Sequence, residues 1–222
     1  MKIEFDLLAN AEDSLQQAIK LVAWPDEDSE PRRLKGAVQA IAHGLELLLK
    51  ERLRRVHPCL IWENVDKYPN PNSRTVTAEI AISRLTNAAG IHFHQDDLSL
   101  LRSLRAMRNA IEHFKWSTTK AEADALVGKA LEFAFHFSRT ELNHEFFGYH
   151  TKRDDTYQAL ISSSSALSLA LAKRAFSPKV EPPVKMATCY FCRARAFDPS
   201  QSKCTICGES GYAGDVDDDQ PF

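Results

Sequence analysis

The chain begins with two runs of apolar residues at helical spacing. In residues 3–24 the apolar positions fall on one stripe, which consists of Phe5, Leu8, Ala11, Leu15, Ile19 and Val22. A second stripe steps by four and three positions, through Leu34, Val38, Ile41, Leu45 and Leu48. It predicts an amphipathic helix from near Pro31 to about Val56, just before Pro58. The segment WPDEDSEP separates the two runs and predicts a turn.

A loop and a short helix are expected next. Residues 62–76 contain the proline- and asparagine-rich sequence YPNPNSR, which predicts a loop. Residues 77–88 predict a short helix that Gly90 stops. Asp96 or Asp97 is then the expected N-cap of a further helix.

That further helix and two later ones complete the predicted domain. Apolar residues step by four, three, four and three positions through Leu100, Leu104, Met107, Ile111 and Phe114. Residues 120–145 carry a similar stripe, and residues 154–176 predict a last helix. No strand pattern exceeds the helical one before residue 186. We therefore expect an all-α domain over residues 1–176, built as an antiparallel helical bundle.

The composition changes after residue 176. Residues 177–186 contain three prolines and predict a linker. Residues 187–212 are rich in cysteine and small polar residues and form a second, small module. Residues 213–222 are an acidic tail, which we expect to be disordered.

Composition and charge narrow the function classes. The chain is 44% hydrophobic and 26% charged, as soluble globular proteins are. No apolar run approaches the roughly 20 residues of a membrane span, and the first residues lack the apolar stretch of a signal peptide, so we expect a cytoplasmic protein. The net charge of −2 provides no global basic field for nucleic acid, although a local patch is enough for a small RNA site.

Four of the five cysteines form two C-x-x-C pairs. Cys189 and Cys192 are separated from Cys204 and Cys207 by eleven residues. Two such turns can bring four thiolates to one ion, and zinc is favoured over iron. The alternative is a redox dithiol, which usually uses a single C-x-x-C near a βαβ unit. We expect a structural Zn²⁺ site in a small zinc ribbon.

Two kinds of partner are open for this ribbon. Arg193, Arg195 and Lys203 are basic, and Tyr190 and Phe191 can stack on bases, which suits nucleic acid. The acidic tail opposes phosphate, so a protein-docking module is an equal alternative.

The remaining candidate chemistry lies in RNAIEHF, residues 108–114. Arg108 and His113 form an Arg-x4-His pair, but fifteen arginines and eight histidines predict roughly one accidental match in every two such chains. The chain contains three, of which the others begin at Arg52 and Arg139. Spacing alone therefore indicates nothing.

Helical geometry distinguishes the pair at Arg108. Asn109 and His113 are four apart and lie one turn above the other on one face, which Arg108 flanks. Glu112 is four from Arg108 and can hold its guanidinium in place. From the residues alone, such a cluster at a helix end is more often a solvated face than a site.

Two stretches resemble the HEPN family of all-α domains, whose name stands for higher eukaryotes and prokaryotes nucleotide-binding. Residues 108–113, RNAIEH, are similar to its motif of arginine, a polar residue, a short gap and histidine. Residues 42–53, AHGLELLLKERL, resemble its second long helix. The order of the expected helices is also similar. The resemblance covers about residues 1–146 and does not cover the ribbon.

The resemblance implies a metal-independent endoribonuclease of the toxin or defence type. His113 would act as general base on the ribose 2′-hydroxyl or as acid on the leaving oxygen. Arg108 would bind the scissile phosphate, and Asn109 would orient the phosphate or the histidine. The product would be a 2′,3′-cyclic phosphate. Lys50, Arg54 and Lys115 would line the RNA groove.

The same resemblance implies partners. Family members often form homodimers in which two motif helices face each other across the twofold axis. Some work with an antitoxin or a nucleotidyltransferase, and others are non-catalytic. A protein- or nucleic-acid-binding module is therefore the alternative, and a small-nucleotide sensor is a third.

Overall fold

The structure is a computed structural model, and it describes residues 4–24, 30–146 and 155–175, with residues 187, 189, 197–199, 202–204 and 210. The α-helices are α1 Leu7–Ala23, α2 Glu30–Val56, α3 Ala78–Ala89, α4 Gln95–His113, α5 Lys120–Leu142, α6 Asp155–Ser163 and α7 Ser165–Ala175. Two 3₁₀ turns, η2 Pro58–Ile61 and η3 Val65–Lys67, and two short strands, β1 Phe197–Asp198 and β2 Lys203–Cys204, complete the elements. The all-α prediction for the main domain is confirmed.

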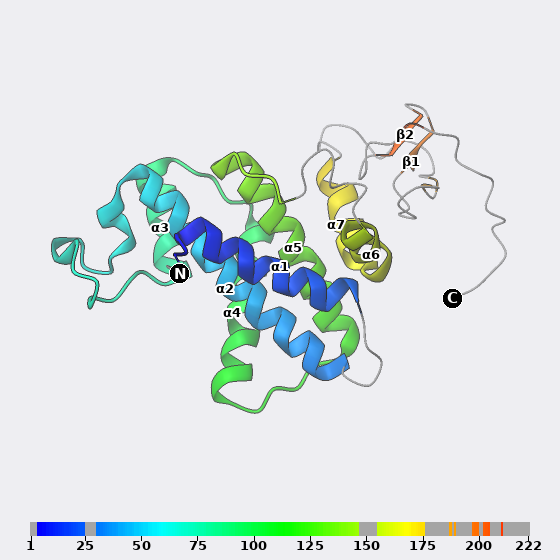
Figure 1. The fold of residues 1–222 in the computed structure, drawn as a ribbon, viewed down its shortest axis with the longest axis horizontal. Coiled ribbons are helices and arrows are strands. Elements are labelled where there is room, and N and C mark those ends of the chain that lie inside the picture. Colours follow the sequence, from blue (N-terminus) through cyan, green and yellow to red (C-terminus); the bar gives the residue numbers. More distant parts are fainter. Residues whose placement is uncertain are drawn as a thin grey trace.

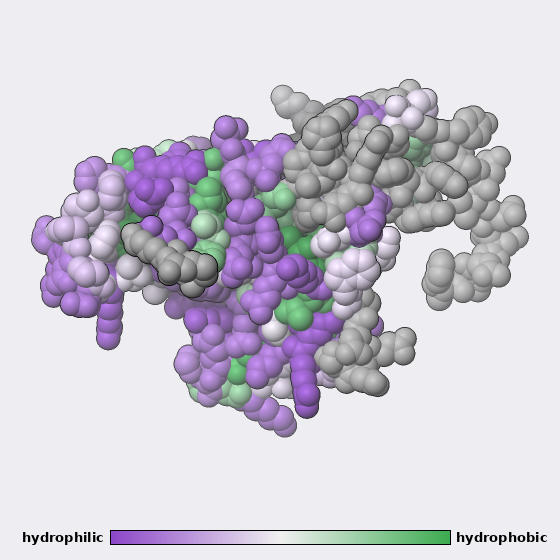
Figure 2. Space-filling view, viewed as in Figure 1, coloured by the Kyte–Doolittle hydropathy of each residue, from purple (hydrophilic) through white to green (hydrophobic). Residues whose placement is uncertain are grey.

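The helices pack around α2. Figure 1 shows α1 and α2 side by side and antiparallel, while α4 and α5 both contact α2. The pair α6 and α7 packs against the bundle, α6 on α1 and α7 on α5. Hydrophilic residues dominate the face in Figure 2, apart from hydrophobic residues over the middle of the bundle around α1. No helix in the described part of the chain is both long and apolar enough to cross a membrane.

Side-chain caps determine several helix ends. The Asp6 carboxylate accepts a hydrogen bond from the Ala9 amide at 2.8 Å, so α1 begins at Leu7 rather than at residue 3. Thr119 and Glu122 form a capping box at the start of α5. Gly90, with φ of 67°, ends α3 in the left-handed conformation that glycine adopts without strain, as predicted.

The core is tightly packed where α1 crosses α2. At Gly44 an added Cβ would lie only 2.6 Å from Cγ of Leu15. Leu15 is fully buried, as are most of the stripe residues predicted for α2, namely Val38, Ile41, Leu45 and Leu48. Glycine at position 44 therefore allows the two helix backbones to approach.

The loop predicted at residues 62–76 is held by two side chains from the neighbouring helices. The Arg84 guanidinium of α3 donates to three carbonyl oxygens, those of Leu60 and Trp62 at 2.6 Å and that of Glu63 at 2.8 Å. The Lys50 ammonium of α2 donates to Thr75 at 3.0 Å. The loop is thus irregular and ordered by charged donors.

Two helix predictions need correction. The single helix expected over residues 154–176 is two helices in the described residues, because Ser164 caps α7 by accepting a hydrogen bond from the Leu167 amide at 3.2 Å. The N-cap of α4 is His94 and not Asp96 or Asp97, which lie in its first turn. Asp97 bonds Arg174 instead of capping the helix.

Candidate functional site

The motif helix α4 is anchored mainly by its N-terminal half. Its buried residues are Asp97, Leu101 and Leu104, whereas the motif occupies its last turns. The stripe continues through Met107 and Ile111, which are half-buried, to Phe114, which is 78% exposed. The helix therefore packs at one end and presents its motif near the surface.

Arg108 and His113 converge on the carboxylate of Glu112. Nε of Arg108 lies 2.8 Å from Oε1 of Glu112, and Nε2 of His113 lies 3.8 Å from Oε2. The Arg108 and His113 side chains are 43% and 64% exposed. The Glu112 carboxylate thus lies near both Arg108 and His113, at a position that is open to solvent.

Asn109 lies on the same stretch of α4 and is half-buried. Helical geometry places it one turn before His113. Because His113 is in the last turn, the unpaired carbonyls at this helix end favour positive charge nearby. Lys115, fully outside the helix and exposed, adds a cation just beyond the motif.

A cavity of about 350 Å³ lies between the start of α2 and the loop that follows the motif. It is lined by Glu30, Pro31, Leu34, Trp116, Ser117, Thr118, Thr119 and Lys120. The Lys120 ammonium lies 2.6 Å from the Glu30 carboxylate, and this hydrogen bond lowers the pKa of Glu30 and raises that of Lys120. Figure 1 shows the C-terminal end of α4 and the start of α5 at the same end of the bundle. Arg108, Asn109 and His113 are not among the lining residues.

The pairs at Arg52 and Arg139 have no such convergence. Arg52 bonds Glu141 at 3.2 Å, whereas Nδ1 of His57 lies 3.0 Å from the sulfur of Cys59. His144 faces Glu12 of α1 at 3.8 Å. Among the three Arg-x4-His pairs, all within the described residues, only at Arg108 do both side chains lie near the same carboxylate.

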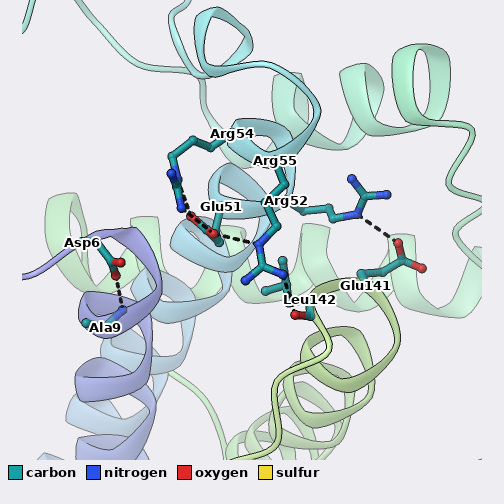
Figure 3. A network of polar contacts seen from close by, with 8 residues as sticks. All are labelled: Asp6, Ala9, Glu51, Arg52, Arg54, Arg55, Glu141 and Leu142. Carbon is teal, nitrogen blue, oxygen red and sulfur yellow. Dashed lines mark hydrogen bonds and ion pairs between the residues drawn. The ribbon is translucent and has the colours of Figure 1, made fainter.

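Two of the three predicted RNA-lining cations serve the fold. Lys50 is buried, and its ammonium bonds Glu46 at 2.6 Å as well as Thr75. Arg54 bonds Glu51 in bidentate fashion at 2.7 and 2.9 Å, and Arg55 shares the same carboxylate (Figure 3). Both lie toward the C-terminal end of α2, and the motif lies at a different end of the bundle (Figure 1). The structure therefore brings only Lys115 next to the motif.

Glu51 is a buried charge with two cations. Burial alone would raise the pKa of its carboxyl, but hydrogen bonds from Arg54 and Arg55 outweigh burial, and the net pKa is lowered. Arg55 also donates to the carbonyl of Leu142 at the end of α5 (Figure 3). This network ties the end of α2 to the end of α5.

A second charged cluster was not identified from the sequence. Arg174 of α7 bonds Asp97 of α4 and Glu132 of α5. The sequence analysis singles out no pattern at Glu132, and it predicts Asp97 only as an N-cap. Partners 77 positions apart, as Asp97 and Arg174 are, leave no local pattern.

The described part of the cysteine module is compatible with a thiolate site. Phe197 pairs with Cys204 in an antiparallel sheet and bridges to Ala187, which precedes Cys189 by two positions. Cys189 and Cys204 are both buried. Cys192 and Cys207 lie outside the described residues, and within the described ones no three His, Cys, Asp or Glu side chains form a group that could hold a metal.

Comparisons with protein-family models, with curated proteins and with solved structures found no match for this chain. The resemblance to the HEPN family therefore rests on the residues of the motif, on residues 42–53 and on the order of the helices.

Proposed function

We propose that this protein is a metal-independent endoribonuclease that acts through Arg108, Asn109 and His113. The observation that carries the proposal is the shared position of Arg108 and His113 around one carboxylate at an exposed helix end. A scissile phosphate can take the place of the Glu112 carboxylate, because both groups present oxygens that accept from a guanidinium.

In this mechanism Arg108 binds the phosphate and stabilises the charge that grows on it. His113 takes the proton of the ribose 2′-hydroxyl or gives one to the leaving 5′-oxygen, since imidazole does both near neutral pH. The 2′-oxygen attacks the adjacent phosphorus, the bond to the 5′-oxygen breaks, and a 2′,3′-cyclic phosphate results. Asn109 orients the phosphate, and Lys115 adds positive charge.

We also propose that the active form is a homodimer. Phe114, which is 78% exposed, leaves an apolar side chain beside the motif for a second copy, while Met107 and Ile111 pack partly against the core. Two motifs in one groove would concentrate positive charge on a chain whose net charge is −2. An antitoxin or nucleotidyltransferase would act at the same groove.

The cysteine module is proposed to hold one structural Zn²⁺ through Cys189, Cys192, Cys204 and Cys207. The two described cysteines are buried near one small sheet, as ligands of a ribbon are. The ion would stabilise a module too small for a core of its own and would take no part in the reaction.

The deciding experiment is RNA digestion in EDTA with purified full-length protein. We expect the wild type and His92→Ala, which changes an exposed histidine outside the motif, to cleave single-stranded RNA. His113→Ala should lose cleavage by at least about 100-fold, the usual contribution of a general acid or base. Arg108→Ala should lose at least about 100-fold as well, because it removes the cation that stabilises the growing charge. Cleavage by all four proteins alike, or by none, would contradict the proposal.

The alternative function is a non-catalytic protein- or RNA-binding module. The ion pair between Arg108 and Glu112 favours it, because this pair satisfies the arginine without any ligand. RNA binding by the wild type without cleavage, lost in Arg108→Ala and kept in His113→Ala, would support this alternative.

A further inference from the structure

One arginine ties the last helix of the bundle to the motif helix. Nη2 of Arg174 lies 2.7 Å from Oδ1 of Asp97 in α4, and its Nε lies 2.5 Å from Oε1 of Glu132 in α5. Asp97 and Glu132 are only 8% and 5% exposed. A buried carboxylate that loses its cation is left as an uncompensated charge. Both carboxylates therefore depend on α7 being in place.

The helix that carries Arg174 packs on α5 without room for a side chain between them. A Cβ added at Gly128 of α5 would lie 2.5 Å from the backbone nitrogen of Leu167 and 2.8 Å from the carbonyl carbon of Ala166. Leu167 is fully buried in the same contact. Such a close contact is lost as a unit when α7 separates, because no flexible side chain can span a gap there.

The buried residues of the motif helix lie toward its start, while Met107 and Ile111 pack partly against the core nearer the motif. Asp97 is one of the three buried residues of α4, with Leu101 and Leu104, and all three lie in its first half. Arg108 is eleven positions further on, which is about 16 Å along a helix. Asp97 and Arg108 belong to one continuous helix, so the docking of the first turn contributes to the position of the motif.

The charges around Glu132 come from all three helices. Burial raises the pKa of Glu132, Arg174 and Arg139 oppose that rise, and Asp97 adds to it. His136, one turn further along α5, has its pKa lowered by burial and by the two arginines, with smaller opposite contributions from Asp97 and Glu141. Its buried Nδ1 has no hydrogen-bond partner among the described residues. The cluster therefore responds to loss of the Arg174 cation.

We propose that α7 is a strap that sets the position of the motif helix, with Arg174 as the positioning residue. When α7 is docked, it holds the first turn of α4 against α5. When α7 separates, Asp97 and Glu132 lose their cation and the first turn of α4 is released. In the sequence α7 is followed by the C-terminal cysteines. This inference does not depend on ribonuclease activity.

Hydrogen exchange of the full-length protein tests the strap. In Arg174→Met we expect the amides of α7 and of the first two turns of α4 to exchange at least ten-fold faster, with α1 and α2 within two-fold of the wild type. Arg33→Met is the matched control, because Arg33 is also buried and donates to the Leu21 carbonyl at 2.8 Å. It should affect α1 and α2 and leave α4 and α7 protected.

A second substitution distinguishes the effect of the lost charge from the effect of lost packing. If stranded charge is the cause, Glu132→Gln in the Arg174→Met background should restore at least half of the lost protection. Because burial favours the protonated Glu132, docking in Arg174→Met should weaken as the pH rises, so its defect should be larger at pH 8 than at pH 5.5 after correction for intrinsic exchange.

Three outcomes would overturn the strap. The first is wild-type protection of α4 in Arg174→Met. The second is equal loss of protection in all helices, which means general unfolding. The third is no recovery, or further loss, on adding Glu132→Gln, which means that stranded charge does not release the first turn of α4.

Discussion

The guanidinium of Arg108 bonds the carboxylate of Glu112 one helical turn away, at 2.8 Å. Both side chains are partly exposed, so the pair gains little in water and is easily exchanged for another anion. The same carboxylate faces His113. Glu112 therefore both orients the arginine and competes with any phosphate that approaches it.

Glu112→Gln should increase binding of a short single-stranded RNA by about two- to ten-fold, because the phosphate no longer competes with a carboxylate. Its free energy of unfolding should change by less than about 0.5 kcal/mol, as for exposed pairs four apart on a helix. Fluorescence anisotropy and urea unfolding measure the two effects. Glu79→Gln, which removes the partner of Arg105 outside the motif, is the control and should leave RNA binding unchanged. Equal or weaker binding in Glu112→Gln would show that no anion enters beside Arg108.

Gly44→Ala should lower the free energy of unfolding by about 1–3 kcal/mol, because the new methyl group meets Leu15 where α1 and α2 touch. Gly36→Ala lies in the same helix, and its Cβ would approach only the end of Leu21 at 3.1 Å. This control should gain up to about 1 kcal/mol from the better helix propensity of alanine. Chemical unfolding of both variants compares them, and similar losses in the two would mean that close packing at Gly44 is unimportant.

Much of the helical bundle follows from local pattern. The stripes of α1, α2, α4 and α5 recur at helical spacing, and Gly90 ends α3 as its type suggests. The break at Ser164 was missed because the apolar residues on its two sides continue one helical pattern, so only the cap itself reveals the break. Hydrophobic periodicity indicates which residues are buried, but it does not reveal a helix break of one residue such as the one at Ser164.

Arg84→Met should loosen the loop between α2 and α3. Three carbonyl oxygens lose their donor, and we expect a cost of about 1–3 kcal/mol in the free energy of unfolding. Limited proteolysis should show cleavage within residues 57–76 at least ten-fold sooner than in the wild type. Arg102→Met, which changes an exposed arginine of α4, is the control. Unchanged proteolysis in Arg84→Met would assign the order of the loop to its own turns.

Glu51 should give the protein acid sensitivity. Its pKa in the folded state is lower than the ordinary value of 4.5, so the stability it provides is present above pH 4.5 and is lost as the pH falls below it. Urea unfolding between pH 3 and pH 7 should show a shallower acid limb in Glu51→Gln than in the wild type. Glu63→Gln, an exposed loop carboxylate, should keep the wild-type slope. Identical slopes for all three would mean that other carboxylates govern acid unfolding.

The candidate site was less predictable than the fold. The stacking of Asn109 and His113 and the reach of Glu112 follow from positions along one helix, so the sequence alone indicates them. The roles of Lys50 and Arg54 do not, because a cation on an amphipathic helix looks the same whether it faces RNA or bonds Thr75 and Glu51. Ion pairs between distant segments depend on how helices meet, and that information is absent from any local window.

The position of Arg174 near the end of the helical bundle has a consequence for biosynthesis. The ribosome makes Asp97 and Glu132 first and adds their shared cation about 40 residues after Glu132, which takes roughly 2 to 8 seconds at 5–20 residues per second. During that interval the nascent chain holds two carboxylates without their arginine, and the motif helix lacks its final support. In the proposed endoribonuclease, the helix that carries Arg108 and His113 would thus gain this support only after the ribosome has passed Arg174.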